Sequence, residues 1–322
     1  MAASYLQVLA LVAWLALLAG SGGRNAIRDT LRRATSRGPR PLRMLAEQVD
    51  WIGAAGLIAV GAWLTLSDAR PSVVDATVYW RLDLDRLYAE SLVNRVGAYL
   101  YSPVFAQVGE PFTFLRWTVW YGGWTAINLV ALGWVLGPAA ALLTLAFPLV
   151  GNALWSGNIH FLMAAAAVLA VSIPIAWAFP LLTKVTPGVG ILWHAARREW
   201  RSLAIGLGST AAIATVSFLV APDLWRDWLE VLGRSSDAPP VNTLLPLALP
   251  IRLALAAGVV FLGGIRGWAW TIPVAMVIAQ PVFWTAGLVV LIAVVPLSRP
   301  RAALAWSSAA ERGVSSSADR RE

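Results

Sequence analysis

The sequence predicts an all-α fold, a polytopic bundle of about seven to nine transmembrane helices. Three observations support this prediction. Of the 322 residues, 58% are hydrophobic and 13% are charged, whereas a soluble domain carries about 25% charged residues. Several apolar runs approach or exceed the ~20 residues that cross a ~30 Å hydrocarbon core. Most of the 18 tryptophans flank these runs, as tryptophans do at membrane interfaces.

The apolar runs predict one integral membrane domain over residues 1–297 and a flexible cytoplasmic tail over 298–322, because the connections are too short to fold separately. The net charge of +8 does not indicate nucleic-acid binding. The arginines stand beside the apolar runs, which is the positive-inside pattern of membrane proteins. The absence of cysteine excludes disulfides, thiol chemistry and cysteine-based metal sites.

The first two apolar runs set the expected orientation. Residues 4–20 predict a span rather than a signal peptide, because no basic residue precedes them. Seven arginines follow within 24–48, which predicts a cytoplasmic loop and an extracytoplasmic N-terminus. Residues 51–67 then cross outward, so 68–107 form an extracytoplasmic loop. Within this loop, the apolar face of 84–96 predicts a short helix in the headgroup plane.

The later part of the chain alternates further spans with broken or amphipathic segments. Residues 175–193 are interrupted by prolines, glycines and Lys184, and the basic stretch 194–201 follows. We therefore expect a re-entrant hairpin that starts and finishes on the cytoplasmic side, with its backbone covered by protein. Residues 222–233 predict an interfacial amphipathic helix. The last run is broken by Pro273 and Pro281 and is expected to form two short spans ending in the cytoplasm. The predicted spans after the loop are 117–136, 139–155, 157–174, 202–221, 243–263 and 268–297.

Asp75 is the first candidate for chemistry. It lies just beyond a predicted span, and the aromatic residues Tyr79 and Trp80 follow it closely enough to contact a sugar ring or a lipid. A carboxylate at the edge of a low-dielectric cavity can have a raised pKa and act as a general base. Asp75 followed by Ala-Thr-Val is also a reasonable helix N-cap, and the residues alone leave both interpretations open.

Three polar residues inside apolar segments are further candidates. Lys184 could pair with a phosphate, since ionisable groups within a membrane are often functional, or its ammonium could extend to the headgroups. Asn158 and His160 offer several hydrogen-bond donors next to a glycine, or they could simply join neighbouring helices. The spacing of His, Asp and Glu predicts no metal site. No nucleotide-binding motif supports an ATP-driven activity.

Four segments together resemble glycosyltransferase family 87, over about residues 50–297. They are DATVYW, AYLYSPVFA, SGNIHFLMAAA and WAFPLLTKVTPGVGILWHAARREWRSLAIG. The resemblance implies a GT-C-like fold and an inverting hexosyltransferase, with mannose favoured by analogy. It implies a polyprenyl-phosphate-sugar donor, a lipid or glycan acceptor and transfer on the extracytoplasmic side. Membrane lipids are then partners, and no cofactor and no nucleic acid is expected.

The resemblance also assigns roles to residues. Asp75 matches the family's general base in the first extracytoplasmic loop. The leaving phosphate then requires cationic or donor groups that face Asp75 across the sugar, although the predicted topology puts Lys184 near the inner leaflet. The candidate substrate-binding residues are Tyr79, Tyr101, Asn158, His160, Lys184 and Arg252.

Two other classes of function remain open from the residues alone. A lipid or solute transporter would use the broken segments 175–193 and 268–297, with polar residues gathered around Lys184 and Asn158. A non-catalytic scaffold would leave Asp75 capping a helix in solvent, and 222–233 and the arginine-rich segment would be docking surfaces. An enzyme instead requires Asp75 at a cavity that is open to both water and the leaflet.

Overall fold

A computed structural model of the chain describes residues 2–67, 74–89, 91, 97–236, 247–282 and 284–299. Within these ranges the chain is helical and contains no strand. Four of the described helices are long and apolar enough to cross a membrane, or up to six if each of two bent helix pairs is one span. They are α3 (Arg40–Leu66), α6 (Trp117–Leu136), α12 (Trp200–Val220) and α14 (Leu249–Arg266).

The prediction of an α-helical membrane protein is therefore confirmed, whereas the count of seven to nine spans is not. The difference lies in segments that are apolar but short. Helix α9 (His160–Ala170) has eleven residues, which is about 16 Å of helix and half of a ~30 Å hydrocarbon core. The pieces η6 (Thr285–Ala293) and α16 (Val294–Leu297) are also shorter than a single span.

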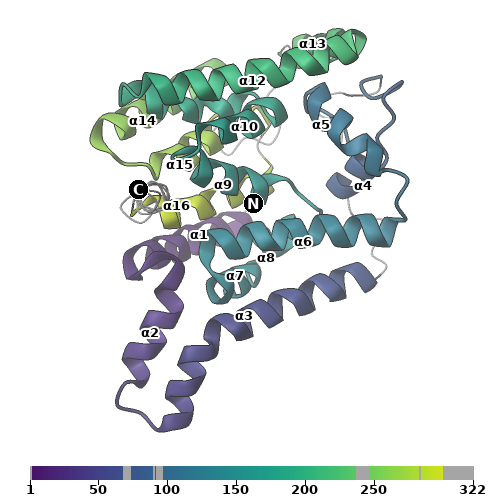
Figure 1. Cartoon of the computed structure of the whole chain (residues 1–322). Helices are drawn as coiled ribbons and strands as arrows, with labels where there is room; N and C mark the ends of the chain where they lie inside the picture. The colour runs from purple at the N-terminus through teal and green to yellow at the C-terminus, as the bar shows by residue number, and fades with distance from the viewer. Residues whose placement is uncertain are drawn as a thin grey trace, which may run out of the picture.

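The long helices give the molecule two ends (Figure 1). At the first, the α4 end, α3 finishes and α6 begins, beside the short helices α4 (Val74–Trp80) and α5 (Pro103–Gly109). Helix α13 (Pro222–Ser236) also lies at this end, after α12. The opposite end, the α2 end, holds α2 (Ala26–Thr35) and the start of α3.

The chain bends sharply at two places, once after the first predicted span and once within the predicted span 139–155. Helix α1 (Ala2–Ser21) is followed by η1 (Gly23–Asn25) and α2 after a bend of 99°. Residues 139–155 form α7 (Pro138–Leu145) and α8 (Pro148–Trp155), bent by 96°. Pro148 accounts for the second break, because its ring removes a backbone donor and clashes with a continuing helix, yet it fits the first turn of the next one.

Residues 174–196 fold into short helical pieces that pass back and forth beside α9. Lys184 lies next to His160 at the start of α9, whereas His194 lies next to Ala170 at its end. The segment thus starts and finishes near one end of α9 and turns near the other, which is a hairpin. Its immersion in a bilayer as a re-entrant element stays a prediction. The pieces are η4 (Pro174–Trp177), α10 (Ala178–Thr183), η5 (Thr186–Ile191) and α11 (Leu192–Ala196).

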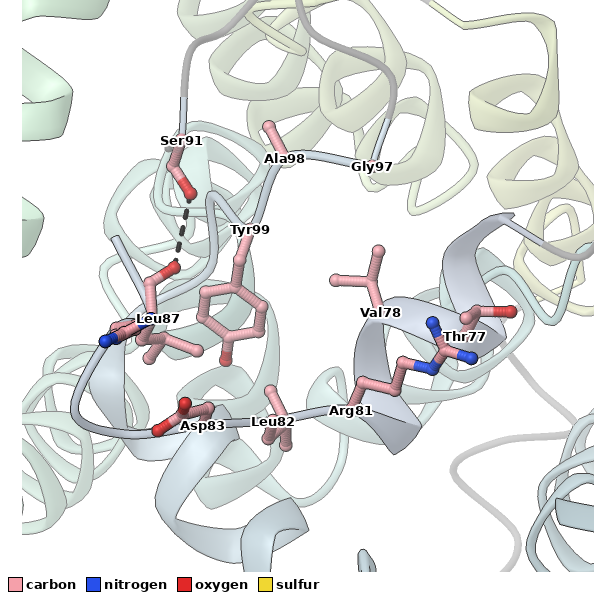
Figure 2. A pocket seen from close by; sticks show the side chains of 11 residues that line it. Thr77, Val78, Arg81, Leu82, Asp83, Leu87, Ser91, Gly97, Ala98 and Tyr99 are labelled. Atoms are coloured by element: carbon pink, nitrogen blue, oxygen red, sulfur yellow. Dashed lines mark hydrogen bonds between the residues drawn. The ribbon is translucent and has the colours of Figure 1, made fainter. Parts of the chain in front are cut away.

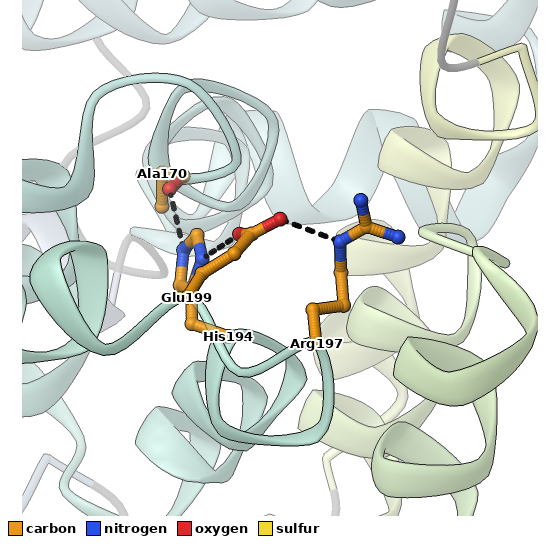
Figure 3. A network of polar contacts seen from close by, with 4 residues as sticks. All are labelled: Ala170, His194, Arg197 and Glu199. Atoms are coloured by element: carbon orange, nitrogen blue, oxygen red, sulfur yellow. Dashed lines mark hydrogen bonds and ion pairs between the residues drawn. The ribbon is translucent and has the colours of Figure 1, made fainter.

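A network of polar contacts lies at the end of this hairpin, where the chain enters α12 (Figure 3). The buried ring of His194 is 3.1 Å from Ala170 O through Nε2 and 2.8 Å from Glu199 Oε2 through Nδ1. Arg197 Nε donates to Glu199 Oε1 at 2.6 Å. Arg198 has φ 59° and makes the turn into α12. The network joins α9, α11 and α12, and both ring nitrogens of His194 are engaged in it.

The loop at the α4 end differs from its prediction in one respect. Residues 84–89, expected to begin a helix over 84–96, form turns instead, and 90 and 92–96 lie outside the described residues. Within the turns, the backbone N–H of Asp85 donates to Asp83 Oδ1 at 3.1 Å, a local bond that competes with helix formation. Helix η3 (Glu110–Phe112) follows α5.

The predicted amphipathic helix at 222–233 is present as α13, and part of its apolar face packs against protein. Leu224, Trp228 and Val231 are buried, and Trp228 Nε1 donates to Leu100 O at 3.3 Å. Leu229, on the predicted apolar face, is instead 59% exposed. The helix therefore covers the loop at the α4 end as well as facing outward.

The last apolar run is interrupted near Gln280-Pro281, as predicted, but not at Pro273, which lies in the first turn of α15 and fits there. Helix α15 (Thr271–Ile278) ends before this pair, and η6 and α16 follow it. The expected tail at 298–322 lies almost entirely outside the described residues, which end at 299.

Candidate functional site

Asp75 is hydrogen-bonded to the turn between α8 and α9. It lies in the first turn of α4, where a negative charge is favourable to the helix dipole. Its Oδ2 accepts a hydrogen bond from Asn158 Nδ2 at 2.8 Å. Asn158 Oδ1 in turn accepts from the backbone N–H of His160 at 3.1 Å, which fixes the orientation of the amide. The carboxylate thus does more than start a helix, because a distant segment holds it in place.

The turn that presents Asn158 depends on Gly157. This residue has φ +70°, and a Cβ there would lie 2.5 Å from Ala76 Cβ. The carbonyl of Gly157 accepts from Trp124 Nε1 at 2.6 Å, and Ala76 N donates to Ser156 O at 2.9 Å. Glycine therefore allows α4 and the turn to approach closely, as its place in the sequence suggested.

Lys184 joins this group from the tip of the hairpin. Its Nζ lies 3.2 Å from His160 Nε2 and 5.5 Å from the centre of the Tyr101 ring. The predicted topology put Lys184 near the inner leaflet, away from Asp75. In the structure Lys184 instead lies near Asp75, because α10 leads the chain back to the start of α9. An ammonium has no acceptor, so its bond to Nε2 assigns the imidazole proton to Nδ1. That Nδ1 is buried and has no partner among the described residues.

Burial and charge act against each other on Asp75. Burial raises the pKa of the Asp75 carboxyl, and the nearby Lys184 charge and hydrogen bonds from Asn158 and Ser156 offset this only in part. The carboxylate is half-buried and remains partly exposed. Burial likewise lowers the pKa of Lys184, to about 8, against the effect of Asp75. A carboxylate with a raised pKa can accept a proton more readily near neutral pH.

The two candidate tyrosines, Tyr79 and Tyr101, pack next to this group. The hydroxyls of Tyr79 and Tyr101 are 2.6 Å apart, and their rings are 2% and 7% exposed. The ring of Tyr79 also meets that of Trp124 edge-on, with centroids 5.5 Å apart, and Lys184 covers the ring of Tyr101. Ser102 Oγ donates to Leu182 O, which ties this segment to α10. Because both tyrosines are buried, we infer that they hold Lys184 and α4 in place rather than stack on a sugar.

The structure does not bring Arg252 to the Asp75 group. Its side chain is 2% exposed and donates to Leu247 O at 3.1 Å, Gln280 O at 2.5 Å and Pro281 O at 3.0 Å. These last two carbonyls stand at the break between α15 and η6. Arg252 therefore satisfies backbone acceptors that the broken helix leaves without partners.

A cavity of about 370 Å³ lies along another face of α4 (Figure 2). Thr77, Val78 and Arg81 line it from α4, and Asp83 and Tyr99 line it from the loop. Asp75 is not among its lining residues, but the Tyr99 ring lies 5.4 Å from the Tyr101 ring. The cavity thus adjoins the Asp75 group through α4 and the tyrosines. Sequence reasoning missed this site, whose only signal was the charged residues at 81–86.

The arrangement places a partly exposed carboxylate near a cation. Asn158 orients the carboxylate of Asp75, and Lys184 supplies a positive charge that acts on it. Among the described residues, no three His, Asp or Glu side chains are grouped to hold a metal ion. A base beside a cation can remove a proton from a hydroxyl and stabilise a departing anion.

Comparison with known proteins gives one match. The sequence model of glycosyltransferase family 87 matches residues 99–311, well over half of the chain. Asn158, His160 and Lys184 fall inside the matched residues, whereas Asp75 and Tyr79 precede them. No curated protein and no solved structure matches the chain.

Proposed function

Because this chain belongs to glycosyltransferase family 87, we propose that it transfers a hexose, with mannose favoured, from a polyprenyl-phosphate-sugar donor to a lipid or glycan acceptor. Glycosyl transfer follows from the family itself, and the apolar helices make it a membrane protein. The GT-C-like architecture, the inverting outcome and the sugar rest on the resemblance of the sequence to the family.

The observation that carries the proposal is the contact of Asp75 with Asn158 near Lys184. In the proposed reaction, Asp75 takes the proton from the acceptor hydroxyl, and that oxygen attacks the anomeric carbon. The bond from this carbon to the donor phosphate oxygen breaks, and the electron pair leaves with the phosphate. Attack from the face opposite the leaving group inverts the anomeric carbon.

In this proposal, the residues around Asp75 stabilise the leaving phosphate or hold the reacting groups in position. Lys184 and the Nδ1–H of His160 stabilise the negative charge of the leaving phosphate, because preorganised donors in a dry site are effective there. Asn158 holds Asp75 in place. Tyr79 and Tyr101 hold Lys184 and α4 in place through their mutual hydrogen bond and the contact of Lys184 with the Tyr101 ring. Arg252 is not assigned to the substrate, since its donors bond to backbone carbonyls.

The proposal also places the molecule in the membrane. The α4 end would be extracytoplasmic, and the α2 end, with its arginines, cytoplasmic. The N-terminus would then be extracytoplasmic and the C-terminus cytoplasmic, in the cell membrane. The hairpin of 174–196 would be re-entrant, with Lys184 at its tip on the extracytoplasmic side, and short pieces such as α9 would complete spans together with it.

A transporter would also gather polar residues around Lys184 and Asn158, and this group is present. The group nevertheless includes a carboxylate suited to proton removal, and the chain belongs to a family of glycosyltransferases. A scaffold would leave Asp75 in solvent, whereas Asp75 is half-buried. We therefore assign the group to sugar transfer.

The test is a transfer assay with the purified full chain in nanodiscs. Radiolabelled polyprenyl-phosphate mannose, glucose and galactose are supplied separately, with a membrane lipid extract as acceptor, and nucleotide sugars serve as the comparison donors. We expect label in the acceptor fraction only with a lipid-linked donor. Label transferred from nucleotide sugars alone would overturn the donor class, and no transfer from any donor would overturn the activity.

A further inference from the structure

The helical hairpin formed by α2 and the first part of α3, residues 26–50, exposes a cationic surface at the α2 end. Two nearby arginines are engaged: Arg24 lies over the Trp134 ring, 5.7 Å from its centre, and Arg28 NH1 lies 3.2 Å from Asp50 Oδ2. Five more arginines are exposed and have no acidic partner within 4.0 Å among the described residues. They are Arg32, Arg33, Arg37, Arg40 and Arg43.

Apolar side chains lie exposed among these arginines. In the first two turns of α3, Leu42, Met44 and Leu45 are 47%, 49% and 54% exposed. Binding to a nucleic acid depends mainly on cations that contact its phosphates and does not require a group of exposed aliphatic side chains beside them. A mixture of arginines and aliphatic side chains is instead typical of elements at a bilayer interface, where cations meet phosphates and apolar groups enter the acyl boundary.

The length of α3 places this surface at the membrane. Helix α3 has 27 residues, or about 40 Å, which exceeds a ~30 Å hydrocarbon core by roughly 10 Å. Trp51 is 79% exposed, and tryptophan favours the interface. A ~30 Å core takes about 20 residues of helix, so counted back from Leu66 it leaves residues 40–46 at the interface. Helix α2 folds back beside them (Figure 1).

We propose that this α2–α3 hairpin binds the anionic lipid headgroups of the leaflet in which α3 begins. The five exposed arginines contact the phosphates, and Leu42, Met44 and Leu45 enter the boundary of the acyl chains. The charge of the surface selects anionic over zwitterionic lipids, because basic residues next to a membrane are attracted to negative surface potential within a Debye length. The inference does not depend on the proposed reaction.

The chain contains no cysteine, so a single cysteine reports on the hairpin without background. Ser36→Cys, between α2 and α3, is labelled with a fluorophore in the full chain. Nanodiscs contain phosphatidylcholine alone or with about one third phosphatidylglycerol, and both carry a lipid with a nitroxide on its headgroup. We expect at least twofold stronger quenching with phosphatidylglycerol, and loss of that difference when salt is raised from about 0.1 M to 1 M.

Substitutions test whether the five arginines cause the difference in quenching between the two lipids. Replacing the five exposed arginines by Gln should remove the difference between the two lipids, whereas Arg226→Gln with Arg234→Gln on α13 should leave it unchanged. The salt titration of the Ser36→Cys chain, with all its arginines retained, tests the proposal even if the five-arginine variant fails to fold. Equal quenching in both lipids would overturn the proposal, as would a difference that high salt leaves unaltered. Equal quenching in both lipids, together with binding of an RNA oligonucleotide that is lost in the five-arginine variant, would favour a nucleic-acid partner instead.

Discussion

Asp75 takes its chemical character from three neighbours contributed by distant parts of the chain. Burial raises the pKa of its carboxyl, and Lys184, Asn158 and Ser156 oppose that change. The sequence predicted Asp75, Asn158, His160 and Lys184 as candidates, because each is a polar residue in or beside an apolar segment. Their contacts could not be predicted, since the depth of Lys184 depends on where α9 ends and how α10 returns.

Removal of the Lys184 charge should change the pH dependence of transfer. Asp75 must be ionised to accept a proton, so activity rises as pH increases through its pKa, which already lies above the ordinary value. Lys184→Met removes a charge that lowers this pKa, so the acidic limb of the pH–rate profile should move to higher pH. The rate should also fall about 10²-fold, as when one stabilising donor is lost.

Lys184→Arg is the matched control, because it keeps the charge and should leave the acidic limb in place. Rates are measured from pH 4 to 8 with saturating donor. A limb that stays fixed, or moves to lower pH, in Lys184→Met would show that Lys184 does not act on the general base.

At the scale of elements, the predictions succeeded where a helix is long and uniform. Helix α6 begins and ends where its apolar run does, at 117 and 136, and α13 begins with the amphipathic pattern at 222. The sequence did not predict the right-angle bend before α8, although Pro148 was its signal. It also placed a helix at 84–96 where the described residues 84–89 form turns, because an apolar face was counted without the local bond between Asp83 and Asp85.

The turn before α9 should not tolerate a side chain at Gly157. A non-glycine residue at φ +70° is strained by about 1–2 kcal/mol, and the new Cβ would meet Ala76. Gly157→Ala should therefore lower the melting temperature and separate Asn158 from Asp75, with at least a tenfold loss of transfer. Gly123→Ala is the control, because a Cβ there meets nothing within 4 Å and alanine favours a helix. Equal stability of the two variants would contradict the packing described for α4.

Arg252 should act on stability rather than on the reaction. Arg252→Met removes the donors of three backbone carbonyls, two of them at the helix break, and an unsatisfied buried polar group costs about 1–3 kcal/mol. We expect a lower melting temperature, an unchanged acidic limb and an unchanged KM for the donor at a temperature where the variant is folded. A large rise in donor KM with unaltered stability would instead return Arg252 to the substrate site.

Over the whole molecule, the Asp75 group and the arginine-rich hairpin lie at opposite ends (Figure 1). The loop at the α4 end carries charges of both signs, whereas the α2 end carries the exposed arginines. The arginine-rich segment of the sequence predicted a separate basic end. The predicted count of seven to nine spans is not confirmed, because apolar residues also build short helices such as α9, in which seven residues are buried.

The two ends should react with an impermeant reagent from opposite sides of the membrane. Ala89→Cys in the loop and Ser36→Cys in the α2–α3 turn are both exposed positions in a chain without cysteine. A membrane-impermeant maleimide should label Ala89→Cys in intact cells and Ser36→Cys only in inverted vesicles. The reverse pattern would place the Asp75 group in the cytoplasm and contradict transfer on the extracytoplasmic side.

Asp75→Asn tests the proposed role of Asp75, which is to remove the proton from the acceptor hydroxyl. Asparagine keeps the size of the side chain but cannot accept the proton. Transfer from the lipid-linked donor is compared in the unaltered chain, Asp75→Asn and Asp85→Asn, the last being an exposed carboxylate of the same loop. We expect Asp75→Asn to lose at least ~100-fold of the rate at unaltered melting temperature, and Asp85→Asn to keep it. Equal rates in all three chains would remove Asp75 from the reaction.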